Sequence, residues 1–234
     1  MLKREDAMRA VVKFATPVIN NGETTQYIGT GFFILKDSQL YLITANHVSK
    51  KFNYDTVVYL AGDSNKVIST NLSFLQLSNI IDHSHADISA IPINIQSFKS
   101  LNATPTIYDA SLIDTTQILN ISRDDELLSI GFPNGLGISH LFEPLSFRSF
   151  PASNIIKNVS GLDGGYTSDV FFMENASCGG YSGCPVLDLG YKVNGLITQS
   201  YDTQIYGVMH GTMCDETGGK MAVVTPAYYI LQII

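Results

Sequence analysis

The feature that most constrains the fold of this chain is a series of short apolar runs of strand length, separated by turn residues. In the first half these runs lie at 10–14, 27–35, 40–44, 56–60, 73–77 and 87–93. In the second half they lie at 126–131, 145–150, 170–174, 185–187, 193–200, 205–209 and 221–225. Many short strands joined by turns are typical of closed barrels or packed sandwiches. The sequence therefore predicts an all-β protein, with a less regular connection over 96–123.

A helical signal stands at the end of the chain. Thr225 and Pro226 form an N-cap followed by a first-turn proline, and apolar side chains share one helical face over 229–234. We therefore expect a short C-terminal helix docked on the β structure. A chain of 234 residues, 45% of them hydrophobic, can bury a substantial core, either as one unit of two packed barrels or as two small domains.

Charge and hydropathy argue against several classes of partner. The net charge of −7 disfavours a nucleic-acid surface, which usually carries a basic stripe. No apolar run approaches the roughly 20 residues that span a membrane. The first residues are charged, and Lys13 interrupts the short apolar run that follows, so no signal peptide is expected. The predicted location is cytoplasmic, or secreted or periplasmic if a signal has been removed. We expect no nucleic-acid partner, no membrane partner and no cofactor.

Three residues have the chemistry of an acyl-transfer enzyme and follow one another as histidine, aspartate and serine. Ser182 lies between glycines in the run 178–186, His47 follows an apolar run, and Asp87 opens another. A serine hydroxyl is a weak nucleophile, so it needs a base, and the base needs a carboxylate to fix its tautomer. We assign these roles to Ser182, His47 and Asp87. The N–H groups of Gly180 and Ser182 are the expected oxyanion donors.

A second carboxylate and two further histidines lie beside Asp87. Asp82 is an alternative partner for His47, but apolar residues follow Asp87, which places it at the mouth of a buried strand, whereas Asp82 has the pattern of a loop. His83 and His85 alternate on an extended segment and would share one face, as two zinc ligands do. No further ligand cluster accompanies them, so the sequence predicts a solvated loop and no metal site.

Five segments in register resemble one known family: 29–34, 42–48, 86–90, 130–137 and 180–186. On these segments the chain resembles the chymotrypsin-fold, trypsin-like serine peptidases, and more closely the bacterial protease Do (HtrA-like) branch without its PDZ domain. The resemblance implies two packed six-stranded antiparallel β-barrels and a short C-terminal helix. It places His47 and Asp87 in a barrel over 1–110, and Ser182 with the oxyanion loop in a second barrel over 111–234.

The resemblance also implies a substrate pocket and a reaction. The pocket would be lined by Asn175, Ala176, Ser177, Thr198, Gln199 and Ser200. The implied activity is that of a serine endopeptidase that cuts peptide or protein substrates through an acyl-enzyme intermediate, with limited cleavage of protein partners. The alternative is a catalytically silent protein-binding module on the same fold.

The residues around Ser182 depart from the family pattern. Tyr181 stands where zymogen-type relatives carry an aspartate that pairs with a new N-terminus, so the loop has to be held by packing or by a regulatory protein partner. Cys184 replaces a frequent glycine and is expected to pack behind the site. Cys178 and Cys214 correspond to a pair that is bridged in secreted relatives. An odd cysteine count and a reducing interior weigh against a bridge here.

Overall fold

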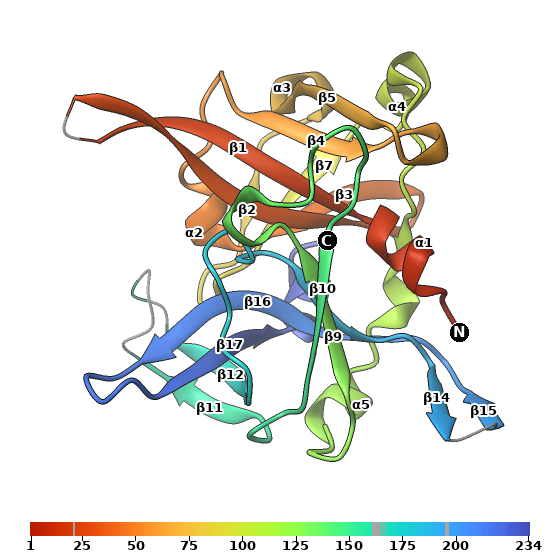
Figure 1. Cartoon of the computed structure of the whole chain (residues 1–234), viewed down its shortest axis with the longest axis vertical. Coiled ribbons are helices and arrows are strands. Elements are labelled where there is room, and N and C mark those ends of the chain that lie inside the picture. The colour runs from red at the N-terminus through yellow and green to blue at the C-terminus, as the bar shows by residue number, and fades with distance from the viewer. Residues whose placement is uncertain (21, 161–164, 166, 195–196) are drawn as a thin grey trace.

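The computed structural model describes residues 1–20, 22–160, 165, 167–194 and 197–234. In this part of the chain most strands belong to two antiparallel sheets, one from each half of the sequence, which lie one above the other in Figure 1. The first sheet contains β1 (Val11–Asn20), β2 (Glu23–Lys36), β3 (Gln39–Thr44), β4 (Val57–Ala61), β5 (Val67–Asn71), β6 (Ile81–Asp82), β7 (Ser89–Ile93) and β8 (Tyr108–Asp109).

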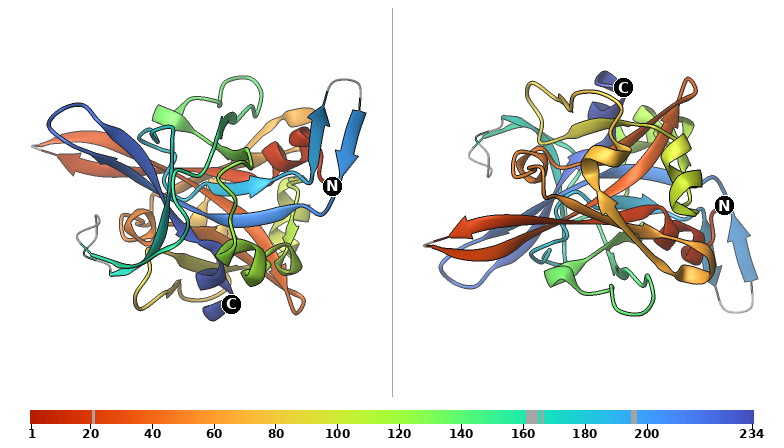
Figure 2. Two further views of the ribbon diagram at one scale, coloured as in Figure 1. Left: turned by 90° about the horizontal axis from the view of Figure 1, so that it is seen from below. Right: turned by 90° about the horizontal axis from the view of Figure 1, so that it is seen from above.

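The second sheet contains β9 (Leu127–Gly131), β10 (Leu145–Ser149), β11 (Ile156–Val159), β12 (Ser168–Met173), β13 (Pro185–Asp188), β16 (Gln204–Cys214) and β17 (Lys220–Pro226). Two more strands, β14 (Tyr191–Asn194) and β15 (Ile197–Ser200), pair with each other in a small separate sheet. This hairpin projects from one end of the molecule (Figures 1 and 2). The β-rich class predicted from the sequence is thus confirmed.

The strand order of each large sheet is open. The first runs β5-β4-β1-β2-β3-β7-β6, with β8 pairing in parallel to β2, and the second runs β10-β9-β13-β16-β17-β12-β11. Among the described residues neither order returns to its first strand, so the two closed six-stranded barrels are not seen as such. The antiparallel sheets themselves agree with the expected fold class.

Short helices connect these strands. The α-helices are α1 (Arg4–Arg9), α2 (Asn46–Ser49), α3 (Leu72–Leu75), α4 (Gln96–Leu101) and α5 (Thr115–Leu119). The 3₁₀ helices are η1 (Asp63–Asn65), η2 (Ala110–Leu112), η3 (Pro133–Gly135) and η4 (Ala227–Gln232). The expected C-terminal helix is therefore present as η4, in 3₁₀ form.

Two predicted strands are corrected. The run 73–77 overlaps α3, whose buried residues Leu72 and Leu75 are three apart, the spacing of one helical face. The run expected as one strand over 193–200 includes 195–196, which lie outside the described residues, and its two flanks belong to β14 and β15. The strand predicted at 205–209 is confirmed and forms part of the longer β16.

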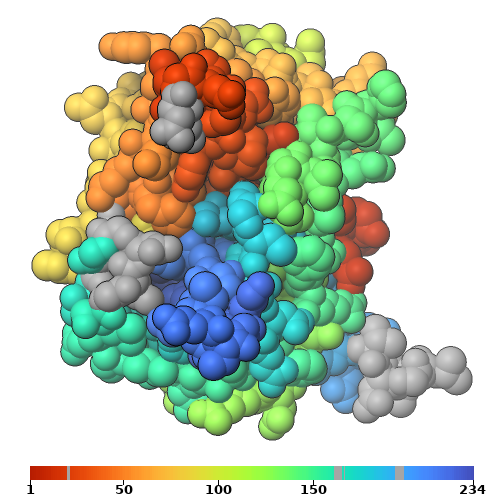
Figure 3. Space-filling model, turned by 60° about the vertical axis from the view of Figure 1, so that its left-hand side comes forward, coloured from red at the N-terminus to blue at the C-terminus, as the bar shows by residue number. Residues whose placement is uncertain are grey.

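Part of the core lies between the two sheets, and a second buried cluster lies within the first half. One buried cluster joins Phe32 of β2 to Ile130 of β9 and Phe171 of β12, so both halves contribute to it. Each chain terminus also contacts the opposite half of the sequence. The Leu2 N–H donates to the Leu189 carbonyl at 2.9 Å, and Lys36 Nζ donates to the Ile234 carbonyl at 2.6 Å. Figure 3 shows the first half (orange and red) seated on the second (blue). The candidate site lies at this junction.

Candidate active site

His47 lies on α2, directly after the buried strand β3. Because β3 is hydrogen-bonded between β2 and β7, the end of β3 has a fixed position, and α2 begins two residues later. Two hydrogen bonds hold His47 to one carboxylate: its backbone N–H donates to Asp87 Oδ1 at 2.8 Å, and its Nδ1 lies 2.6 Å from Asp87 Oδ2. The side chain keeps 21% of its surface exposed. The ring is thus oriented from its inner edge, while its outer part remains accessible.

Asp87 lies between β6 and β7 and is almost completely buried, with 1% exposure. Burial by itself would raise the pKa of this carboxyl group, but the hydrogen bonds and charges of the adjacent His210 and His47 together outweigh burial, so the net pKa is well below its usual value. The group is therefore a carboxylate at neutral pH. It can fix the Nδ1–H tautomer of His47 and stabilise an imidazolium.

The neighbouring alternatives have other roles. Asp82 is exposed and accepts a hydrogen bond from Ser89 Oγ at 2.6 Å. His83 Nδ1 accepts from the N–H groups of His85 and Ala86, and its Nε2 lies 2.9 Å from Gln232 Oε1. Both ring nitrogens of His83 are thus occupied. The structure brings Asp87, and not Asp82, to His47.

Ser182 lies in a tight turn that ends at β13. The Cys184 N–H donates to the Tyr181 carbonyl at 2.9 Å, and the Gly183 N–H donates to the Met209 carbonyl of β16 at 2.8 Å. Gly183 has φ +89°, and a Cβ at this position would overlap the Thr30 carbonyl oxygen of β2. Glycine is required here by both the backbone conformation and the close approach. The turn is consequently pinned between the two halves of the molecule.

The Ser182 hydroxyl is directed at strand β16. Its Oγ donates to the His210 carbonyl at 3.0 Å, so its proton is not shared with His47 in this conformation. A rotation about χ1 is the motion that moves an Oγ between such acceptors. The histidine, aspartate and serine predicted from the sequence are therefore assembled at one place, with the hydroxyl in a resting position.

His210 was not predicted from the sequence, and it contacts two members of the set. Its ring is 4% exposed, its Nδ1 lies 2.7 Å from Asp87 Oδ2, and its ring centre is 5.4 Å from that of His47. The residue lies at a bulge, because Met209 pairs with Val224 and Gly211 pairs with Val223. A bulge re-aims the side chain of the extra residue. This local irregularity accounts for the direction of the His210 ring.

The two expected oxyanion donors lie on the same turn. The Asn134 N–H donates to the Gly179 carbonyl at 2.6 Å, so the Gly180 N–H of this trans peptide points to the opposite side. The Gly180 carbonyl accepts from Thr30 Oγ1 at 2.7 Å, and the Ser182 carbonyl accepts from the Thr30 N–H at 2.9 Å. Thr30 thus fixes the carbonyls on either side of Tyr181.

Tyr181 anchors the turn in the core of the second half. Its side chain is 1% exposed and its ring stacks on Phe147 at 5.1 Å, while its hydroxyl donates to the Leu145 carbonyl at 2.7 Å. Burial raises the pKa of the Tyr181 phenol, which stays protonated as a donor. Cys184 is fully buried, and burial raises its pKa too, so it is no thiolate nucleophile. Packing holds this turn without an acidic residue at position 181.

The expected pocket residues fall into two groups. The Ser177 carbonyl accepts from Thr212 Oγ1 at 2.9 Å, which places the segment 175–177 beside β16 near His210. Asn175 donates from its backbone to Ser149 Oγ at 3.0 Å and from its side chain to the Arg148 carbonyl at 2.9 Å. This first group, Asn175, Ala176 and Ser177, thus lies beside β16, and its role in a substrate pocket stays a prediction.

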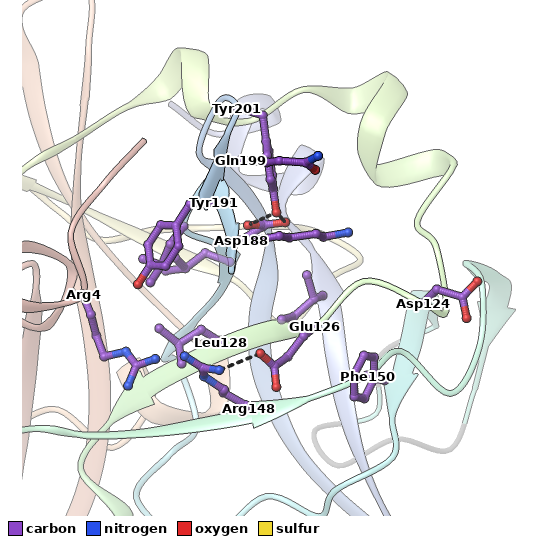
Figure 4. Close-up of a pocket in the computed structure, with 14 residues that line it drawn as sticks. Arg4, Asp124, Glu126, Leu128, Arg148, Phe150, Asp188, Tyr191, Gln199 and Tyr201 are labelled. Atoms are coloured by element: carbon purple, nitrogen blue, oxygen red, sulfur yellow. Dashed lines mark hydrogen bonds and ion pairs between the residues drawn. The ribbon is translucent and has the colours of Figure 1, made fainter. Parts of the chain in front are cut away.

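The second group, Thr198, Gln199 and Ser200, lies elsewhere, and this placement corrects the expectation. These residues are exposed on β15, which pairs with β14, while the strand paired with β13 is β16. Gln199 lines a different cavity of about 490 Å³ together with Arg4, Glu126 and Tyr201 (Figure 4). None of His47, Asp87 and Ser182 lines that cavity. Because β14 and β15 come first in the sequence, the strand that pairs with β13 occurs later, as β16.

Three free cysteines and one cluster of potential metal ligands lie among the described residues. Cys178 and Cys214 are both free and exposed, and Cys184 is free and buried. Among the described residues, one group of potential metal ligands is present, formed by His47, Asp87 and His210, whose donor atoms lie within 4.8 Å of one another. In the same part of the chain, no helix is long and apolar enough to span a membrane.

Comparison with known proteins relates this architecture to one fold. No family model matches the chain, and no curated protein matches it. Three proteases are among the solved structures that are similar in fold. The active form of the Rv3671c protease from M. tuberculosis has a TM-score of 0.61 and 20% identity, over 97% of this chain and 80% of that one. The apo MamO protease domain from Magnetospirillum magneticum has a TM-score of 0.62 and 14% identity, over 99% of both chains.

The third structure, the HtrA-type protease AlgW with a decapeptide, has a TM-score of 0.59 and 16% identity, over 99% of this chain and 66% of that one. The chain therefore has the chymotrypsin, or trypsin-like, serine protease fold. Within that fold it is similar to HtrA-type proteases over nearly its whole length. At these identities the likeness is one of fold.

Proposed function

We propose that this protein is a serine endopeptidase on a two-barrel, trypsin-like scaffold. The part over 1–110 supplies His47 and Asp87, and the part over 111–234 supplies Ser182 and the oxyanion loop. One observation carries the proposal: both carboxylate oxygens of the buried Asp87 bind His47, at 2.8 Å and 2.6 Å, beside the glycine-bounded turn of Ser182. A structural ion pair has no need of a partly exposed imidazole, whereas a general base does.

The reaction needs one rearrangement of the resting structure. Ser182 Oγ leaves the His210 carbonyl and turns to His47 Nε2. It then attacks the peptide carbonyl, forming the C–O bond as its proton passes to Nε2. The developing oxyanion accepts from the N–H groups of Gly180 and Ser182. Collapse breaks the C–N bond and returns the proton to the leaving amine, and water hydrolyses the acyl-enzyme by the same proton path in reverse.

We propose a peptide or protein substrate, bound along β16 and the segment 175–177. The presence of a decapeptide in the structure of the HtrA-type protease AlgW supports this class of substrate. The exposed outer part of His47 supports access from solvent. Limited cleavage of a few protein partners, under a regulatory partner that acts on the Ser182 turn, is consistent with the resting position of the hydroxyl.

The test uses an active-site probe and matched serine variants. A fluorophosphonate should label the wild-type chain and not Ser182→Ala, while Ser200→Ala, altered on the distant β15, should label like the wild type. Peptide hydrolysis by Ser182→Ala should have a kcat lower by about six orders of magnitude. Labelling that survives Ser182→Ala would exclude this nucleophile.

The resting hydroxyl also favours a second candidate, the catalytically silent binding module. In that case neither the wild type nor Ser182→Ala would be labelled, and both would bind peptides equally. An unbiased peptide-library digest with Ser182→Ala as the control separates the two candidates, because only the endopeptidase produces cleavages that depend on Ser182.

A further inference from the structure

Asp87 lies between two imidazoles that use the same oxygen. His47 Nδ1 is 2.6 Å from Asp87 Oδ2, in a direction that makes a hydrogen bond. His210 Nδ1 is 2.7 Å from the same oxygen, yet neither ring nitrogen of His210 makes a hydrogen bond with any described residue. At that distance the missing element is alignment, because the N–H direction of the ring does not point at the carboxylate. A buried imidazole in ion-pair contact but without an aligned hydrogen bond thus faces an already bonded carboxylate.

Burying the His210 ring in this arrangement costs free energy when no cation is bound. A buried polar group without an aligned hydrogen bond loses its hydration and is only partly compensated by a nearby charge. Two imidazoles and one carboxylate are, however, a common ligand set for zinc and related divalent cations. The donor atoms of the three residues lie within 4.8 Å of one another, close enough to share one ion.

The fit requires a small opening of the cluster. Ligands that each lie about 2.0–2.1 Å from a tetrahedral zinc are roughly 3.3 Å from one another. The present separations of 2.6 Å and 2.7 Å are shorter than this. His47 can provide the opening, since it lies on the four-residue helix α2 and its side chain is partly exposed, whereas Asp87 and His210 are buried. The ion would then reach the cluster from the His47 side.

We propose that His47, Asp87 and His210 form a binding site for a divalent transition-metal cation of the Zn²⁺ type, with His47 Nδ1, Asp87 Oδ2 and His210 Nδ1 as protein ligands and water completing the coordination. His83 is no competitor for the ion, because both of its ring nitrogens are already in hydrogen bonds. His85 and His140 are exposed and are not among the clustered donors. Within the part of the chain that the structure describes, the clustered donors therefore occur at one place.

Bound metal would silence the catalytic base, a consequence that rests on the proposed function. A neutral imidazole carries one ring proton. When a cation takes the lone pair of His47 Nδ1, the ring proton resides on Nε2, and the imidazole stays neutral. Nε2 then has no lone pair for the Ser182 proton. Asp87, bound to the cation, also no longer orients the ring. The same ligand thus removes both the base and its support.

The binding test uses the full chain, freed of metal by EDTA and titrated with ZnSO₄. The chain has five histidines, and ¹⁵N-labelled imidazoles report each ring separately. One Zn²⁺ per chain should shift the signals of His47 and His210 and leave His83 and His140 unchanged. Shifts confined to His85 or His140, or no saturable binding, would overturn the proposal. This measurement needs no variant and no catalytic activity.

Variants sharpen the result. His210→Asn removes one ligand and should weaken Zn²⁺ binding at least 10- to 100-fold, the loss that follows even from removing a residue that only supports a ligand. His140→Asn is the matched control and should bind like the wild type. Ser182→Ala should also retain full Zn²⁺ affinity, because Ser182 is not a ligand. If His210→Asn does not fold, the ring signals of the wild type decide the question alone.

The activity assay separates the two proposals. Peptide hydrolysis by the wild type should fall with the same Zn²⁺ midpoint as the ring shifts and return when EDTA is added. Zn²⁺ binding to His47 and His210 in a chain that never hydrolyses peptides would leave the metal site standing and remove the protease. Hydrolysis that is unaffected by saturating Zn²⁺ would overturn the silencing.

Discussion

Replacing Asp87 by asparagine changes one atom of the carboxyl group and tests how the histidine is oriented. Asp87 offers two acceptor oxygens to His47, one to its backbone N–H at 2.8 Å and one to Nδ1 at 2.6 Å. Asparagine offers one oxygen and one NH₂ group. If the oxygen stays on the backbone N–H, the NH₂ faces Nδ1, which must then be unprotonated. The ring proton moves to Nε2, and the base for Ser182 is lost.

The opposite amide orientation is disfavoured by the free-energy cost of an unsatisfied hydrogen-bond donor. It would place the NH₂ against the His47 N–H, leaving a buried donor without an acceptor at about 1–3 kcal/mol. The wrong tautomer therefore dominates. In a characterised triad this change lowers kcat by about 10⁴-fold, or about 5 kcal/mol of transition-state stabilisation. We expect a loss of that order for Asp87→Asn.

The assay is the steady-state hydrolysis of a peptide identified in the library digest. Asp82→Asn is the matched control, since Asp82 is a nearby carboxylate that binds Ser89 and not His47, and its activity should stay within a factor of about three of the wild type. Circular dichroism should show that both variants are folded. A loss of less than about tenfold for Asp87→Asn in a folded protein would refute the argument from the tautomer.

Further predictions concern the Ser182 turn and pH. Tyr181→Phe leaves the Leu145 carbonyl without its donor and should lower the free energy of unfolding by about 1–3 kcal/mol, and Tyr181→Ala by about 3–5 kcal/mol with loss of probe labelling, both read by urea titration. Gly183→Ala should cost several kcal/mol, because its Cβ overlaps backbone, whereas Gly218→Ala, with open space around the Cβ, should cost only about 1–2 kcal/mol. Asp87 has a lowered pKa in the folded state, so its contribution to stability should be complete above about pH 4 and decrease as the pH falls below it. The difference in unfolding free energy between wild type and Asp87→Asn should therefore be smaller at pH 3 than at pH 6.

The residues brought together at the site were predictable where the signal was local. His47 and Asp87 each stand at one end of an apolar run, and Ser182 lies in a turn that its glycines already indicate. Strand ends and tight turns are read from a few neighbouring residues. These local patterns also identified the strands that carry the site, which is why the β-rich class followed from the sequence.

His210 and the position of the pocket strand depend on pairing between distant segments. His210 is aimed at Asp87 by a bulge in β16, and no composition rule marks a bulge in advance. The residues at 198–200 follow Ser182 at a plausible spacing, yet the chain first forms the β14–β15 hairpin and only then enters β16. An inserted hairpin changes which residues reach a site without changing the strand pattern. Only the register between β13 and β16 resolves this.

His210 links the two halves of the proposed catalytic set through different atoms of one residue. Its carbonyl accepts the Ser182 hydroxyl at 3.0 Å, and its ring lies 2.7 Å from the carboxylate that orients His47. A shift of the bulge would therefore change the nucleophile and the support of the base at the same time. If a cation holds the ring of His210, the carbonyl of the same residue is restrained as well, and the hydroxyl stays in its resting position. Metal binding and the resting serine then reinforce each other, so labelling of Ser182 by a fluorophosphonate should be slowed by Zn²⁺ in the wild type.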